Sequence, residues 1–163
     1  MNVQEATTRR LPDLKERHLP ENCRETINTI LKETYGYEQF RNLEIYDDLS
    51  KGKEKLCISQ GQLIENVILE AEKAWKGETQ VDNILLTAPT GSGKSLLFQL
   101  PAIYLGKEYN LLTIVVSPLK ALIVDQVESL QELGYTRVAY ASSDLSPEQK
   151  MEVYRQVREG EID

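Results

Sequence analysis

The spacing of apolar residues changes along the chain, and each change marks a different kind of predicted element. The first 19 residues carry mixed charge and show little periodicity. From Pro20 onward, apolar side chains recur every three or four positions, which predicts a helix that ends at Gly36 and has an apolar face of Ile27, Ile30, Leu31 and Tyr35. Residues 37–58 contain apolar side chains at irregular spacing. We therefore expect residues 1–58 to form an N-terminal helical and irregular extension.

From Ser59 the pattern becomes regular. Ser59 and Gln62 have the spacing of a capping box, and apolar residues follow at helical period up to Trp75. The short apolar run at 84–86 is typical of a strand buried on both faces. The run at 111–116, rich in β-branched residues, predicts a second strand, and residues 137–141 predict a third. Helices are predicted from Leu96, over 117–134 and over 146–160, with Ser117 and Pro118 at the N-cap and N1 positions and a second capping box at Ser146 and Gln149.

This order predicts an α/β fold for residues 59–163. Strands that alternate with helices of this length are joined by right-handed crossovers, so we expect a parallel sheet flanked by helices. Ligands bind at the carboxyl ends of the strands in such sheets. The residues that carry chemistry are therefore sought in the turns after residues 88, 116 and 141.

The first of these turns has the composition of a phosphate-binding loop. It reads Ala88-Pro89-Thr90-Gly91-Ser92-Gly93-Lys94-Ser95, which matches the pattern G-x-x-x-x-G-K-[ST] except that Ala88 replaces the first glycine. The two glycines let the backbone turn so that N–H groups point at phosphate oxygens, and the next helix adds its positive end. Lys94 would meet the β- and γ-phosphates of ATP, and the Ser95 hydroxyl would bind Mg²⁺. The alternative is a surface turn rich in Gly and Ser, which the flanking strand and helix argue against.

Composition narrows the function classes. A chain of 163 residues with a net charge of −7 is expected to form about one domain and does not suit a basic nucleic-acid coat. No apolar run approaches the ~18 residues of a membrane span, and the N-terminus lacks the pattern of a signal peptide. Two cysteines and one histidine are too few for a disulfide framework or a His-rich metal site. We expect a cytoplasmic protein without a membrane partner.

Three blocks of sequence resemble the superfamily-two helicases of DEAD/DEAH type. Residues 86–102 closely resemble their motif I, and its continuation Gln99-Leu100-Pro101-Ala102 is most similar to the RecQ branch. Residues 116–127 are similar to the next motif of that family, and residues 142–147 resemble the segment after the third strand. The resemblance implies part of the first of two RecA-like lobes, with ATP and Mg²⁺ at the loop. It also implies nucleic-acid contact, DNA or RNA, at Ser117, Pro118, Lys120 and Ser143.

The family also has a glutamine upstream of the phosphate-binding loop that reads the adenine edge. Gln60 is the candidate, because it begins the helix that leads into the predicted strand before the loop. However, residues 35–44 resemble the RecQ segment that normally ends in this glutamine, and Glu44 stands at that position. Either an insertion separates the two halves or the earlier match is due to chance. For Ser117 and Pro118, helix capping is the alternative to nucleic-acid contact, and the two roles are compatible.

Hydrolysis in this family needs a later Asp-Glu pair and an arginine from the second lobe, and neither is identified here. We therefore expect a truncated lobe that binds ATP, and nucleic acid weakly, but is inactive alone, with no catalytic residue assigned. The parent would unwind DNA. The alternatives are a non-helicase P-loop enzyme, a nucleotide-responsive binding stub, a duplex translocase and an RNA helicase.

Overall fold

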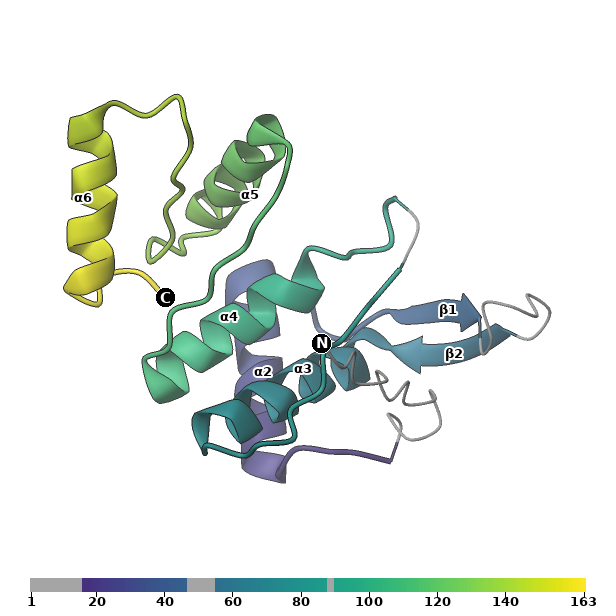
Figure 1. Cartoon of the computed structure of the whole chain (residues 1–163). Helices are drawn as coiled ribbons and strands as arrows, with labels where there is room; N and C mark the ends of the chain where they lie inside the picture. Colours follow the sequence, from purple (N-terminus) through teal and green to yellow (C-terminus); the bar gives the residue numbers. More distant parts are fainter. Residues whose placement is uncertain (1–15, 47–54, 88–89) are drawn as a thin grey trace, which may run out of the picture. The chain divides into compact units, whose positions relative to one another are not determined.

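The computed structural model describes residues 16–46, 55–87 and 90–163 (Figure 1). Its elements are α2 (Glu21–Tyr35), β1 (Asn42–Tyr46), β2 (Lys55–Ser59), α3 (Gln60–Trp75), α4 (Leu96–Tyr109), α5 (Lys120–Glu132) and α6 (Pro147–Arg158). They divide into two compact units, one made of Met1–Arg24 with Phe40–Leu97 and the other of Glu25–Gln39 with Phe98–Asp163. None of the described helices is both long enough and apolar enough to cross a membrane.

In the first unit, an antiparallel hairpin leads directly into α3 (Figure 1). Its register runs from Asn42 opposite Ser59 to Tyr46 opposite Lys55, and the cross-strand pair of Leu43 and Ile58 is buried. Ser59 ends β2 and also caps α3, because its hydroxyl accepts from the backbone N–H of Gly61 while Gln62 accepts from the N–H of Ser59. The predicted capping box is confirmed, whereas the hairpin itself was not predicted.

α3 buries carboxylates as well as aliphatic side chains. Leu63, Ile64 and Ile68 are buried, but so are Glu65 and Glu70. The Glu65 carboxylate accepts from the backbone N–H of Leu19 at 3.1 Å. Buried carboxylates are tolerated only where donors compensate for the lost water. Glu65 therefore fixes residues 16–20, the N-terminal lead-in to α2, against α3.

Glu70 is the larger of these polar junctions. Its carboxylate pairs with Arg17 of the lead-in at 2.6 Å and with Lys73 of α3 at 3.0 Å, and it accepts from the backbone N–H of Asp82 at 2.8 Å. Three segments of the first unit therefore meet at one side chain: the lead-in, α3 and the stretch before the predicted strand at 84–86.

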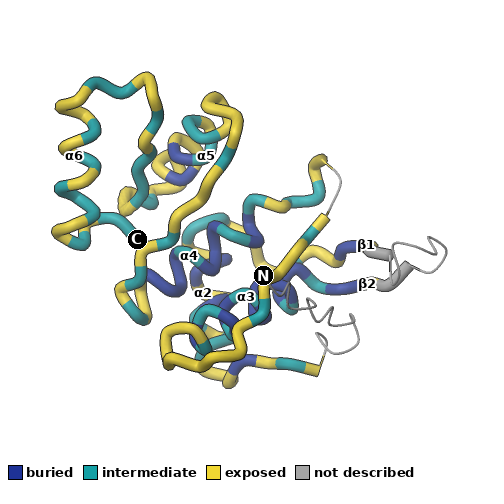
Figure 2. The backbone as a smooth tube through the Cα atoms, in the orientation of Figure 1, coloured by how far each residue is buried: buried dark blue, intermediate teal, exposed yellow. Residues whose placement is uncertain are grey.

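In the second unit, the most deeply buried residues come from α4, with Leu100, Ile103 and Tyr104, and from α2, with Ile30 and Leu31. The buried Gln99 side chain donates to the side-chain oxygen Oε1 of Gln126 at 2.8 Å, which joins α4 to α5. α6 has no buried residue, as Figure 2 also shows. Its capping box at Ser146 and Gln149 is confirmed.

The predicted parallel sheet is the main difference between expectation and structure. The described residues form only the antiparallel β1–β2 sheet, and segments 84–86, 111–116 and 137–141 run without strand pairing. As a result Leu85 and Val116 are each 90% exposed and Ile114 is 77% exposed. A hairpin is closed by a short local loop, whereas parallel strands pair only across long connections and after distant segments have come together. The local sequence pattern predicts such strands, but it does not determine which segments pair with them.

Glu70→Gln should change how the stability depends on pH. Burial raises the pKa of the Glu70 carboxyl, but hydrogen bonds from the Asp82 N–H and from Arg17 and Lys73 outweigh it and lower the pKa to about 2. A lowered folded-state pKa stabilises the fold above the unfolded value, near 4.5, and this contribution is lost as the pH falls toward 2. We expect Glu70→Gln to lower the free energy of unfolding by about 1–3 kcal/mol at neutral pH. Between pH 4.5 and 2 the free energy of unfolding of this variant should fall less steeply than that of the wild type.

Urea unfolding at a series of pH values measures both effects. Glu78→Gln is the control, because it removes a charge at an exposed position just beyond α3. An acid transition in Glu70→Gln as steep as that of the wild type would contradict the assignment.

Candidate phosphate-binding loop and nucleic-acid contact residues

Residues 90–95 form a tight turn directly before α4. Gly91 has φ +80° and Gly93 has φ +78°, both in the left-handed region that side chains disfavour. A Cβ at Gly91 would meet no atom within 4 Å, so the space beside that residue is open. The backbone conformation therefore accounts for both glycines of the motif. Ala88 and Pro89 lie outside the described residues.

The polar groups of the loop suit an anionic ligand. Lys94 and Thr90 are exposed, and Ser95 is half-buried immediately before Leu96, where α4 begins and its positive dipole end lies. The hydroxyl of Ser92 is buried and has no hydrogen-bond partner among the described residues. A buried hydroxyl without a partner is costly and is expected where a ligand or water completes it. The residues present thus fit phosphate groups and a hydrated cation at Ser95.

Gln60 contacts this loop through hydrogen bonds to the loop backbone. Its side chain is buried, and its Nε2 donates to the carbonyl oxygens of Ser92 and Gly93, each at 3.3 Å. Its Oε1 accepts from the backbone N–H of Arg41 at 3.1 Å. A Cβ on Gly93 would lie 2.5 Å from Nε2. Steric space beside Gln60 is therefore a second reason, besides the left-handed backbone, for glycine at this position.

The two candidates for the adenine-reading residue occupy different places. Gln60 contacts the loop, whereas Glu44 lies in β1 opposite Cys57. The amide of Gln60 is bonded to backbone groups in this structure, so contact with an adenine edge would require an exchange of these bonds. The Phe40 ring packs against Gly61, the residue after Gln60, since a Cβ on Gly61 would lie 2.7 Å from it.

The turn before α5 corrects one prediction. The N-cap of α5 is Leu119 and not Ser117, and no side chain caps the helix. Ser117 is occupied locally, since its hydroxyl accepts from the backbone N–H of Leu119 at 3.4 Å, and serine hydroxyls commonly form such turns. Ser117 and Pro118 therefore precede the helix, and Lys120 is its first residue.

Two of the predicted nucleic-acid contact residues meet at one carboxylate. Lys120 Nζ lies 2.6 Å from Asp144 Oδ1, and the Ser143 hydroxyl donates to the same oxygen at 3.2 Å. The hydrogen bond from Lys120 is the main reason that the pKa of Asp144 is lowered. The turns after 116 and 141 are thus joined, although Lys120 and Ser143 lie far apart in the sequence.

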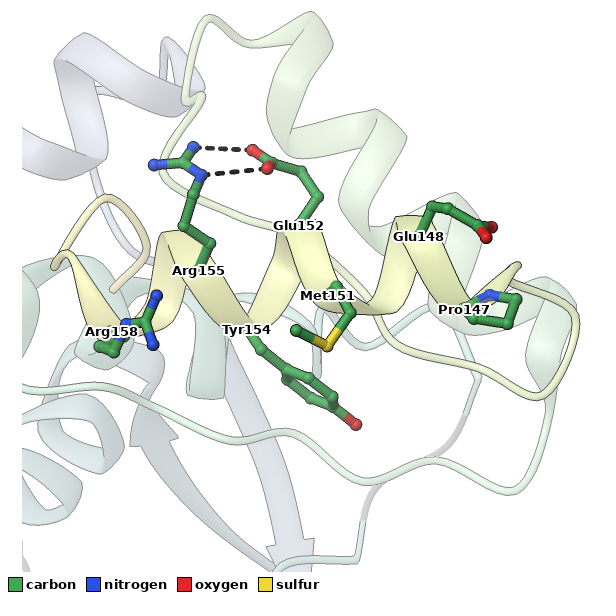
Figure 3. Close-up of a pocket in the computed structure, with 7 residues that line it drawn as sticks. All are labelled: Pro147, Glu148, Met151, Glu152, Tyr154, Arg155 and Arg158. Atoms are coloured by element: carbon green, nitrogen blue, oxygen red, sulfur yellow. Dashed lines mark hydrogen bonds and ion pairs between the residues drawn. The ribbon is translucent and has the colours of Figure 1, made fainter.

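Two further features carry no chemistry of this kind. A pocket of about 560 Å³ lies along α6, and Figure 3 shows Arg155 paired with Glu152 there and Met151 and Tyr154 projecting from the helix. It is lined by one exposed helix face and contains none of the predicted site residues. Among the residues that the structure describes, no group of His, Cys, Asp and Glu is placed to hold a metal ion.

Comparison with known proteins gives an independent line of evidence. Residues 60–162 match the DEAD/DEAH box helicase family. The chain is 32% identical over 132 residues to the ATP-dependent DNA helicase RecQ of Synechocystis, which covers 81% of this chain and 21% of that protein. It is 30% identical over 137 residues to the RecQ of Haemophilus influenzae, which covers 84% of the chain and 17% of that protein. It is also 32% identical to the DNA helicase Q-like 5 of Arabidopsis thaliana, over 85% of the chain and 12% of that protein. No solved structure matches.

Gly93→Ala should destabilise the chain more than an equivalent change elsewhere. Gly77→Ala is the matched control, because Gly77 has φ +76° but no atom within 4 Å of its Cβ position. The left-handed conformation alone costs about 1–2 kcal/mol in either variant. At Gly93 the new methyl group must also displace the Gln60 amide, so we expect a further loss of roughly 1 kcal/mol or more from its hydrogen bonds. Denaturant unfolding measures the difference, and equal losses in the two variants would contradict the Gln60 contact.

Proposed function

This chain belongs to the DEAD/DEAH box helicase family, and we propose that residues 59–163 form part of the ATP-binding lobe of a RecQ-like DNA helicase. The observation that carries the proposal is the loop at 90–95, with its two left-handed glycines, its lysine and serine, and its place at the start of α4. The chain spans 21% or less of the length of these three relatives. Activity, substrate and second lobe of a whole helicase are therefore proposals.

Membership of the family implies a RecA-like fold. We propose that the segments 84–86, 111–116 and 137–141 are the strands of its parallel sheet. Their exposed apolar side chains, such as Leu85 and Val116, support this, because strands of a parallel sheet are covered on both faces by helices.

For the nucleotide, we propose that the backbone N–H groups of residues 90–93 surround the phosphates of ATP. Pro89 has no N–H to donate and belongs to the proposed site only by its place in the motif. Thr90 and Ser92 can add hydroxyl groups, and Lys94 adds a positive charge at the β- and γ-phosphates. The hydroxyl of Ser95 would be a ligand of Mg²⁺. When bound, the ion neutralises phosphate charge. Gln60 keeps the loop in shape and is our candidate for reading adenine.

For nucleic acid, we propose that Ser117, Pro118, Lys120 and Ser143 contact the phosphodiester backbone. The meeting of Lys120 and Ser143 at one point supports a shared contact strip. A strip of so few groups on a chain of charge −7 implies weak binding that salt reduces, because each phosphate contact releases counterions. The names of the relatives favour DNA over RNA.

Lys94→Ala should abolish most of the stabilisation by Mg·ATP. A ligand at a hundredfold excess over its dissociation constant stabilises the folded chain by about 2.7 kcal/mol. Without the lysine charge the phosphates bind far more weakly, while the stability of the ligand-free chain should change by only about 0.5 kcal/mol, because Lys94 is exposed. Thermal unfolding with and without Mg·ATP measures the shift.

Lys107→Ala is the control for that experiment, because it removes the same side chain from the last turn of α4. It should retain the full shift. An unchanged shift in Lys94→Ala would remove the loop as the nucleotide site.

Gln60→Ala should weaken the binding of ATP more than the binding of GTP. Loss of the bonds to Ser92 and Gly93 loosens the loop for both nucleotides, so the ratio of the two affinities isolates the contact with the base. A side-chain amide both donates and accepts, as the adenine edge requires, whereas guanine presents the reverse pattern. Titration with fluorescent ATP and GTP analogues measures the ratio. Loss of discrimination in Glu44→Ala instead would assign the role to the earlier segment.

A further inference from the structure

We propose that Asp144 occupies the position of a nucleic-acid phosphate at Lys120 and Ser143, so that a bound strand must displace its carboxylate. The inference rests on the proposed nucleic-acid role of these two residues and adds a residue that limits their affinity. Asp144 is not among the residues that the motifs assign to contact, and it carries the charge of the ligand rather than that of the site.

The geometry is that of an anion bound by its donors. One oxygen of Asp144 receives both the Lys120 ammonium, at 2.6 Å, and the Ser143 hydroxyl, at 3.2 Å. These are the types of donor that hold a phosphate oxygen, and carboxylate and phosphate oxygens accept from them in the same way. A phosphate that took the same two donors would have to remove Asp144 from them.

Local structure keeps Asp144 in this position. Its backbone N–H donates to the Ser142 hydroxyl at 3.3 Å, and two residues later Ser146 caps α6. The carboxylate is therefore presented by a short turn between fixed points and not by a long flexible segment. Lys150, one turn into α6, adds a second positive charge nearby and favours the ionised form of Asp144.

Both partners of the ion pair are open to a ligand. The side chain of Lys120 is 54% exposed and that of Asp144 is 68% exposed. Exposed ion pairs contribute little to folding, typically less than is needed to hold an element in place. The pair is therefore weak enough for a strand to open, and its loss should alter binding while leaving the fold intact.

The test is the affinity of the chain for fluorescein-labelled oligothymidylate, measured by anisotropy over a range of salt concentrations. We expect Asp144→Asn to tighten binding by about 1.5-fold to fivefold, the range that corresponds to an exposed ion pair. The slope of log affinity against log salt concentration should also steepen by up to ~0.7. In the wild type, the displaced Asp144 carboxylate takes up a cation and offsets part of the counterion release, and Asp144→Asn removes that offset. Oligouridylate serves as the second arm and tells whether the strip distinguishes DNA from RNA.

Two controls separate displacement from a general charge effect. Glu132→Gln removes the same charge at the other end of α5, about 18 Å from Lys120 along the helix and beyond the screening length of ~8 Å. It should bind as the wild type does. In a Lys120→Ala background, Asp144→Asn should no longer tighten binding, because the donor that it frees is gone.

The outcomes distinguish the two levels of the proposal. If the wild type binds and Asp144→Asn behaves like Glu132→Gln, or if its gain persists without Lys120, the displacement role is wrong and the contact strip stands. If neither the wild type nor Asp144→Asn binds either oligonucleotide at low salt, the strip itself is wrong, and the inference fails with it.

Discussion

The arrangement of the first unit depends on the side-chain amide of Gln60. It is buried at the junction of three segments, where it accepts from the N–H of Arg41 and donates to the carbonyls of Ser92 and Gly93. A loop with two left-handed glycines has little conformational preference of its own. The amide supplies that preference, since it ties the loop to the hairpin and to the start of α3. Whatever binds at the loop therefore meets a backbone already ordered from one side.

Polar burial of this kind extends along α3. Glu65 and Glu70 fasten the lead-in through Leu19 and Arg17, and Glu70 also holds the N–H of Asp82. An apolar face would have packed these segments without fixing their register, whereas each carboxylate accepts only from donors at set positions. α3 thus orders both the lead-in, through Arg17 and Leu19, and the stretch around Asp82 that precedes the loop.

What the sequence predicted follows from how local each feature is. Both capping boxes and the turn at Gly91 and Gly93 were predicted correctly, because each depends on residues within four positions of one another. The hairpin was missed because each strand alternates over only two apolar positions, Leu43 and Ile45 in β1 and Leu56 and Ile58 in β2, which is too short a run to stand out. The cap at Ser117 was wrong because its hydroxyl turns to Leu119. The partners of the Gln60 side chain, and Lys120 as the partner of Asp144, lie 19 or more residues away, where no spacing rule applies.

The exposed apolar run at 111–116 has a consequence for the self-association of the chain. Its sequence, Leu-Leu-Thr-Ile-Val-Val, has high β-propensity, no charge and no proline. Ile114 and Val116 face solvent, and the backbone of the run is not paired in a sheet. Six-residue segments with this composition stack readily against copies of themselves into cross-β assemblies. At high concentration, self-association through this segment would therefore compete with its pairing in the parallel sheet that we propose.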